Sequence, residues 1–228
     1  MMFSAFFFDM DGVLFNSMPK HAAAWVKVMQ EHGFDFNEED CYMNEGRTGL
    51  DVIAEHIWAL EHREASEDEA WEIYEEKARV FRTLGEVEPI EGVIDVLRYL
   101  KKTKRQIWVV TGSAQSTLLD NLNTKIGPFF DRERMITAFD VTHGKPNPEP
   151  YLKAWDKSKF PKKDCCVIEN APLGVRAGKA AGLFTIAVNT GPLADAALLN
   201  EGADKVFPNM AELLLWLKEG DGISASLH

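Results

Sequence analysis

The chain has 228 residues, of which 46% are hydrophobic, and a formal net charge of -11. A chain of this length and apolar content can bury one large core or two modest ones, so disorder is not its default state. The negative charge argues against a nucleic-acid or anionic-membrane surface as partner, because either would need a broad basic patch.

The chain begins with the apolar segment AFFF at residues 5–8, which predicts a strand buried on both faces. Similar short apolar runs follow at residues 107–111, 135–139, 165–169 and 184–188. Helical patterns lie between these runs and start near residues 92, 116, 148 and 172. Strands that alternate with helices imply right-handed crossovers. We therefore predict an α/β fold with a doubly wound, Rossmann-like parallel sheet.

Residues 18–88 break this alternation, because they hold helical patterns and no convincing strand. The patterns cover residues 19–33, 49–62 and 66–85. Ser66 and Glu69 have the spacing of a capping box at the start of the last one. Three helices exceed what one crossover needs. We therefore predict that residues 18–88 form a helical domain inserted after the first strand.

The cysteines and the N-terminus indicate the cellular compartment. Cys41 stands alone, whereas Cys165 and Cys166 are adjacent and should point to opposite faces of their strand. This usage fits a reduced protein. The start MMFSAFFF lacks the basic residues and long apolar segment of a signal peptide, and no run approaches the ~20 apolar residues of a membrane span. We expect a cytoplasmic monomer without nucleic-acid or membrane partners.

Polar side chains gather where the predicted strands end. They are Asp9 and Asp11 after the first strand, Thr111, Gly112 and Ser113 after the second, Lys145 in a loop beyond the third, and Glu169 and Asn170 at the end of the fourth. In doubly wound sheets the ligand crevice lies at these carboxyl ends, so the groups should converge. Carboxylate and amide oxygens suit Mg²⁺, whereas lysine, hydroxyl and backbone N–H groups suit phosphoryl oxygens. The arrangement predicts phosphoryl transfer with Mg²⁺ as cofactor and a small phosphate compound as substrate.

Each of these signals also has a simpler interpretation. The pair Asp9 and Asp11 could serve turn or capping chemistry, Lys145 could be a solvated loop lysine, and Glu169 could help to cap the next helix. Their order on four successive strand ends favours the catalytic interpretation. A non-enzymatic phosphate-receiver module also uses strand-end acids, a threonine and a lysine. Such a module is short, however, and has no inserted helical domain like residues 18–88.

The segments FDMDGVLFNS, VVTGS, GKPNPEPY and VIENAPLGVRAG resemble the four ordered motifs of the haloacid dehalogenase (HAD) superfamily, and in detail its β-phosphoglucomutase-like branch. The resemblance implies a catalytic core of residues 1–17 and 89–228 and a helical cap domain of residues 18–88. It implies that Asp9 is the nucleophile, which forms an aspartyl-phosphate, and that Asp11 is the acid/base. It also implies that Thr111 and Lys145 hold the transferring phosphoryl group. The implied Mg²⁺ ligands are Asp9, the main-chain oxygen of Asp11, Glu169 and Asn170.

The cap offers candidate substrate-binding residues. The stretch MNEGRTGLD, with Glu45 and Arg47, resembles the family's substrate-specificity loop, and Arg47 would bind an anionic group of the substrate. Gly112 and Ser113 would contribute from the core. His21 resembles the family's histidine that assists the acid/base when the cap closes. From the residues alone, a solvated helix start is the less favoured alternative for the loop, whereas His21 is equally well a polar residue at an interdomain seam.

Some positions depart from the family pattern and bear on the substrate. Asn170 stands where the family usually has Asp, and Ala114 and Gln115 stand where β-phosphoglucomutases tend to carry a basic residue and Asn. The latter departure argues against mutase activity.

The EGRTG and ENAPLG segments resemble HAD-type inorganic pyrophosphatases. In such an enzyme Glu45 could be an extra metal ligand that offsets the charge lost at Asn170, and Arg47 could neutralise the leaving phosphate. We predict a Mg²⁺-dependent phosphohydrolase with pyrophosphate as the favoured substrate. A sugar-phosphate phosphatase and a β-phosphoglucomutase are the alternatives.

Overall fold

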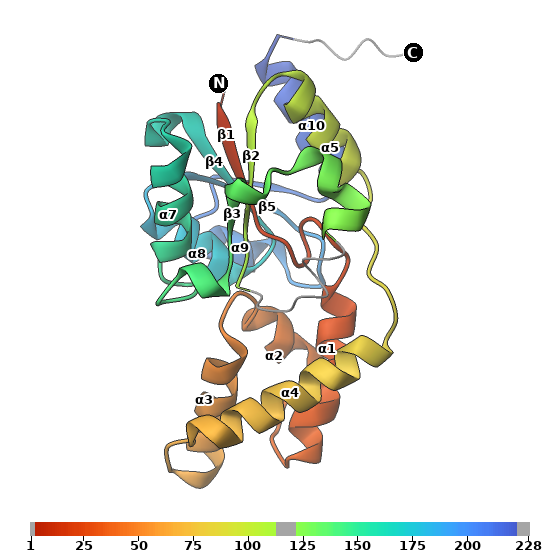
Figure 1. Cartoon of the computed structure of the whole chain (residues 1–228), viewed down its shortest axis with the longest axis vertical. Helices are drawn as coiled ribbons and strands as arrows, with labels where there is room; N and C mark the ends of the chain where they lie inside the picture. Colours follow the sequence, from red (N-terminus) through yellow and green to blue (C-terminus); the bar gives the residue numbers. More distant parts are fainter. Residues whose placement is uncertain (1–2, 113–121, 223–228) are drawn as a thin grey trace.

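The computed structural model describes residues 3–112 and 122–222 and has a parallel sheet between two layers of helices (Figure 1). The strands are β1 (Ala5–Phe8), β2 (Gln106–Val110), β3 (Met135–Ile136), β4 (Cys165–Glu169), β5 (Phe184–Val188) and β6 (Lys205–Phe207). They form a six-stranded sheet in the order β3-β2-β1-β4-β5-β6, and every neighbouring pair is parallel. The predicted doubly wound α/β fold is confirmed.

Both faces of the sheet are covered, which explains the run of phenylalanines in β1. Phe6 and Phe8 belong to the core under α5 (Val93–Lys102) and α10 (Met210–Gly220), whereas Phe7 packs on the opposite face under α7 (Glu149–Ser158) and α8 (Pro172–Ala180). The short helix α9 (Asp195–Asn200) lies beside β6 and α8. Cys165 and Cys166 also face opposite cores, as predicted, and both are free thiols.

Four helices lie between β1 and α5 and form the cap, at the bottom of Figure 1: α1 (Met18–Glu31), α2 (Glu38–Met43), α3 (Gly49–Glu61) and α4 (Glu67–Thr83). They have a hydrophobic cluster of their own, with Trp25, Phe36 and Ile53 among its members. This cluster supports the predicted division at residues 17/18 and 88/89, which stays a prediction.

The two chain segments that enter and leave the cap are paired with each other. The backbone amide of Asn16 donates to the carbonyl of Glu88 at 2.8 Å, and that of Ile90 donates to the carbonyl of Leu14 at 3.0 Å. The cap is therefore joined to the sheet through one narrow, hydrogen-bonded connection. Among the described residues, no helix is both long and apolar enough to cross a bilayer.

Local capping chemistry explains several differences from the predicted elements. The third strand ends at Ile136 instead of residue 139, because Thr137 and Asp140 form a capping box that starts a 3₁₀ turn. Ser66 caps α4 as predicted, but the carboxylate of Glu69 pairs with Arg63 and does not complete the box.

The helices α2, α9 and α10 and the strand β6 were not predicted, and most of the predicted helix near residue 116 lies outside the described residues. The short helical turns are Leu122–Ile126 (π) and Gly127–Phe129, Arg132–Arg134, Ala138–Asp140 and Lys162–Asp164 (3₁₀).

Candidate active site

The strands β1 and β4 end side by side at the edge of the sheet that faces the cap (Figure 1). Asp9 follows β1, and its backbone amide donates to the carbonyl of Ile168 at 3.0 Å, which places it beside Glu169. The strand order runs outward in opposite directions from these two strands. Doubly wound sheets bind ligands at such a switch point.

A buried lysine joins the two strand ends. The ammonium of Lys145 donates to a carboxylate oxygen of Asp9, to Oε1 of Glu169 at 2.6 Å and to the carbonyl of Val110 at 3.2 Å. Burial disfavours this ammonium, but the two carboxylates outweigh burial and raise the pKa of Lys145. A permanent positive charge therefore lies against Asp9 in a site with almost no exposed surface.

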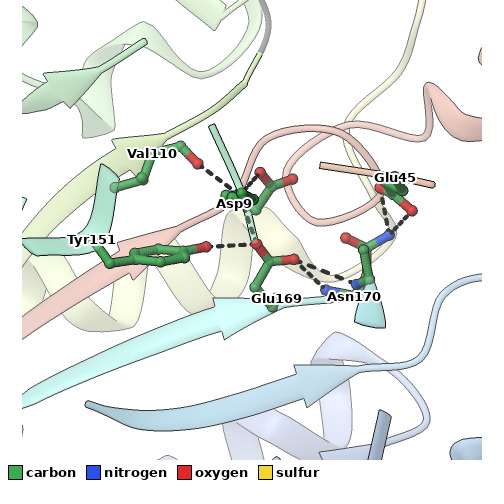
Figure 2. Close-up of polar contacts among 8 residues, drawn as sticks. Asp9, Glu45, Val110, Tyr151, Glu169 and Asn170 are labelled. Carbon is green, nitrogen blue, oxygen red and sulfur yellow. Dashed lines mark hydrogen bonds and ion pairs between the residues drawn. The ribbon is translucent and has the colours of Figure 1, made fainter. Parts of the chain in front are cut away.

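Glu169 is held by donors on all sides (Figure 2). Its Oε1 accepts from Lys145 and from the hydroxyl of Tyr151 at 2.6 Å, and its Oε2 accepts from the backbone amides of Asn170 at 3.1 Å and Ala171 at 3.4 Å. A Cβ atom on Gly174 would lie 2.0 Å from Oε1, so only glycine leaves room for this carboxylate. Burial raises the pKa of Tyr151 well above its ordinary value, which keeps its hydroxyl a donor.

Lys145 alone does not balance the carboxylates of the site, and one buried amide oxygen has no hydrogen-bond partner. Burial raises the pKa of Asp9 to about 8; Lys145 opposes the rise, and Glu169 and Asp11 add to it. The buried Oδ1 of Asn170 has no hydrogen-bond partner, although such atoms normally have one. Both features fit a cation that prefers oxygen, as Mg²⁺ does.

A metal here would need ligands of mixed type. Across residues 3–112 and 122–222, no three His, Cys, Asp or Glu side chains are grouped closely enough to hold a metal. Amide and main-chain oxygens and water would therefore complete the coordination, which is the usual situation for Mg²⁺.

Asp11 has separate partners on the hinge and the cap. Ser17 donates to its Oδ1 at 2.5 Å, and Nε2 of His21 lies 3.3 Å from the same oxygen. On the far side of the imidazole, Nζ of Lys77 lies 2.7 Å from Nδ1. Burial acts to raise the pKa of Asp11, but His21, Ser17 and Lys77 together lower it.

The cap loop that holds Glu45 and Gly46 packs against the site. The amide nitrogen of Asn170 donates to both carboxylate oxygens of Glu45, at 2.9 and 3.0 Å, and Figure 2 shows this nitrogen turned towards Glu45. A Cβ on Gly46 would lie 3.3 Å from the Lys145 side chain, and a Cβ on Gly112 would lie 3.2 Å from the carbonyl oxygen of Gly46. The loop therefore rests directly on the core.

A cavity of about 100 Å³ remains between cap and core. Its polar residues include Asp9, Asp11, His21, Glu45, Arg47, Lys77 and Thr111, and its apolar wall includes Met18, Trp25, Phe36 and Val52. Arg47 is held on the cap by Asn44, at 3.0 Å, and by Glu55. Gly112 also lines the cavity, whereas Ser113 lies outside the described residues, as do Ala114 and Gln115.

A family profile described as haloacid dehalogenase-like hydrolase matches residues 3–182. The chain belongs to this family. The phosphorylated carbohydrates phosphatase of Thermotoga maritima is 31% identical to this HAD-like hydrolase over 219 residues, which cover 94% of this chain and 98% of the relative.

Two further relatives agree with this assignment. The validoxylamine A 7'-phosphate phosphatase of Streptomyces hygroscopicus subsp. limoneus is 27% identical over 215 residues and covers 93% of this chain and 96% of that one. A solved structure from Bacteroides vulgatus, provisionally named a β-phosphoglucomutase, is similar with a TM-score of 0.92 and 46% identity, covering 98% of this chain and 91% of that one. The predicted superfamily, its β-phosphoglucomutase-like branch and a HAD-like phosphatase are thereby confirmed.

Three side chains of this HAD-like hydrolase were missed by the sequence analysis. Ser17 contacts Asp11, Tyr151 contacts Glu169, and Lys77 contacts His21. A signal existed for Lys77, because it occupies the buried face of α4 at helical spacing from Ile73 and Phe81, where a lysine is out of place. Ser17 and Tyr151 are the last residues of the segments FDMDGVLFNS and GKPNPEPY, but the sequence analysis gave neither of them a role.

Proposed function

We propose that the protein is a Mg²⁺-dependent phosphohydrolase that works through an aspartyl-phosphate on Asp9, with inorganic pyrophosphate as the favoured substrate. The observation that carries this proposal is the buried lysine at the end of β1, where Lys145 donates to both Asp9 and Glu169. Glu45 of the cap covers this cluster and accepts a hydrogen bond from Asn170. Mg²⁺ would be held by Asp9, the main-chain oxygen of Asp11, Glu169 and Asn170.

In the first step a carboxylate oxygen of Asp9 attacks phosphorus, the bond from phosphorus to the leaving oxygen breaks, and Asp11 gives its proton to that oxygen. Lys145 lies against Asp9 and neutralises charge on the transferring group, which Thr111 helps to hold from the wall of the cavity. Bound Mg²⁺ supplies electrostatic stabilisation of the phosphoryl oxygens. In the second step Asp11 takes a proton from water, the water oxygen attacks phosphorus, and the bond to Asp9 breaks.

The cap supports a small inorganic leaving group. The cavity is lined by charged side chains of the cap, which suit a second phosphate. Glu45 is a poor neighbour for a phosphate dianion unless a cation lies between them, and its contact with Asn170 places it where it could share that cation. Arg47 lines the same cavity and would neutralise the leaving phosphate.

A second candidate is a sugar-phosphate phosphatase. The names of the Thermotoga maritima and Streptomyces relatives support it. The apolar wall of the cavity, with Trp25 and Phe36, also suits the carbon skeleton of an organic leaving group.

The deciding experiment measures phosphate released by the purified protein from pyrophosphate and from a panel of hexose phosphates, with Mg²⁺ and with EDTA. We expect the highest kcat/KM for pyrophosphate, no turnover in EDTA, and no turnover of any substrate by Asp9→Asn. A higher kcat/KM for a hexose phosphate would select the second candidate. Turnover by Asp9→Asn would refute the aspartyl-phosphate mechanism for both.

A further inference from the structure

We infer that Tyr151 is a positioning residue of the phosphoryl-transfer site: its hydroxyl fixes Glu169, and through Glu169 it fixes the ammonium of Lys145 against Asp9. This inference rests on the proposed function only in taking Asp9 as the residue that meets the phosphoryl group. Tyr151 lies on α7, outside the strand ends that carry the other site residues, and has no exposed surface.

The contacts of Glu169 show why the hydroxyl matters. Oε1 receives two donors, Lys145 and Tyr151, each at 2.6 Å, whereas Oε2 receives only backbone amides at 3.1 and 3.4 Å. Each oxygen of Glu169 therefore has its own set of donors, which fixes the orientation of the carboxylate. Rotation of the carboxylate would break the bond to Tyr151, which is charge-assisted and among the stronger kinds of hydrogen bond.

The position of the Lys145 ammonium depends on the orientation of Glu169, because the lysine side chain is flexible. Its ammonium ends a flexible four-carbon chain and reaches its place through Asp9, Glu169 and the carbonyl of Val110. Tyr151 adds a second contact, because the ammonium lies 5.1 Å from the centre of its ring. The ring and the hydroxyl of one side chain thus constrain both Lys145 and its counter-ion.

Removal of the hydroxyl alone isolates the positioning role. In Tyr151→Phe the ring continues to fill the core and to face Lys145, but Oε1 of Glu169 loses one of its two donors. Glu169 then loses one of the contacts that fix its orientation, so the ammonium of Lys145 is held less tightly against Asp9. The cost should fall on binding of a phosphoryl-transfer mimic and less on folding.

The test uses orthovanadate, which adopts the five-coordinate geometry of phosphoryl transfer, titrated by calorimetry into Mg²⁺-saturated protein. We expect Tyr151→Phe to bind vanadate about tenfold more weakly than wild type, the scale of one hydrogen bond to a charged group. The matched control is Tyr99→Phe on α5, away from the site, which removes a tyrosine hydroxyl that donates to the carboxylate of Asp221 at the end of α10. This control should bind vanadate within about twofold of wild type.

Equal vanadate affinity in Tyr151→Phe and wild type would overturn the inference, whatever the melting temperature. A similar loss in Tyr99→Phe would overturn it too, because the effect would then reflect general destabilisation. The measurement needs no turnover and no particular leaving group. Wild-type protein that binds vanadate but does not hydrolyse pyrophosphate therefore refutes the favoured substrate alone, and wild-type protein that binds no vanadate refutes the phosphoryl site together with this inference.

Discussion

Glu45 of the cap and Asn170 at the end of β4 are joined by two hydrogen bonds, in which one amide nitrogen donates to both carboxylate oxygens at 2.9 and 3.0 Å. The arrangement turns the other polar atom of Asn170, the unpartnered Oδ1, away from Glu45. Burial raises the pKa of Glu45 well above its usual value, and the charge of Asp9 adds to the rise. The cap thus contributes a carboxylate whose ionised form a cation would favour.

Glu45→Ala tests whether the cap takes part in the reaction. We expect kcat/KM for pyrophosphate to fall about 100-fold, the scale of losing one charged group that acts at the reacting centre. The Mg²⁺ concentration for half-maximal rate should rise as well. Steady-state kinetics across a Mg²⁺ series measure both quantities. The control is Glu61→Ala, a cap carboxylate that pairs with Arg63 at the end of α3. Unchanged pyrophosphate kinetics in Glu45→Ala would remove this loop from the mechanism.

Asn170→Asp tests the charge balance between cap and core. Without metal the new carboxylate would face Glu45 at hydrogen-bond distance, so we expect the melting temperature to fall by about 3–6 °C, which corresponds to one to two kcal/mol in a chain of this size. Saturating Mg²⁺ should raise the melting temperature of the variant by more than it raises that of wild type. Thermal denaturation with and without Mg²⁺ makes the comparison, and equal increments in the two proteins would contradict a metal ligand at this position.

The burial of Lys77 should make the free energy of unfolding depend on pH. Burial lowers its pKa in the folded protein from 10.5 to about 8. Between pH 8 and 10.5 the unfolded chain therefore binds a proton that the folded chain does not, and the free energy of unfolding rises with pH. The rise due to this residue is on the order of 3 kcal/mol.

In Lys77→Met this contribution disappears, so wild type should gain stability relative to the variant as the pH increases through that window. Below pH 8 the variant should equal or exceed wild type in stability, because a buried charge is gone. Its turnover should fall, because His21 loses its partner at 2.7 Å. Urea unfolding at a series of pH values measures the difference. Parallel plots of the free energy of unfolding against pH for the two proteins would show that the pKa of Lys77 does not change on folding.

Gly112→Ala tests the contact between cap and core. The new Cβ would lie 3.2 Å from the carbonyl oxygen of Gly46, and neither partner is a side chain that could swing aside. We expect kcat/KM to fall about tenfold or more because the cap loop is displaced from the site, with little change in melting temperature. The control is Gly127→Ala, whose Cβ would have an ordinary contact of 3.7 Å. Kinetics as fast as wild type in Gly112→Ala would show that this close approach is not needed for catalysis.

Five of the six strands and the place of the chemistry could be predicted from the sequence alone. Asp9 and Glu169 could be brought together without coordinates, because parallel strands put their carboxyl ends at one edge and the apolar runs marked where β1 and β4 stop. The third strand was predicted too long, since the local hydrogen bonds of Thr137 and Asp140 outweigh the β-propensity of the residues that follow.

The contacts that side chains from distant segments make with the site follow from the packing of the folded chain. Lys77 and His21 are 56 positions apart, and Asn170 and Glu45 are 125 apart. Tyr151 ends the segment GKPNPEPY, but nothing in that segment indicated a contact with Glu169. Periodicity and motif spacing report the direction of a side chain relative to its own element, whereas these contacts depend on how α4 packs on α1, how α7 packs on the sheet and how closely the cap loop approaches the core.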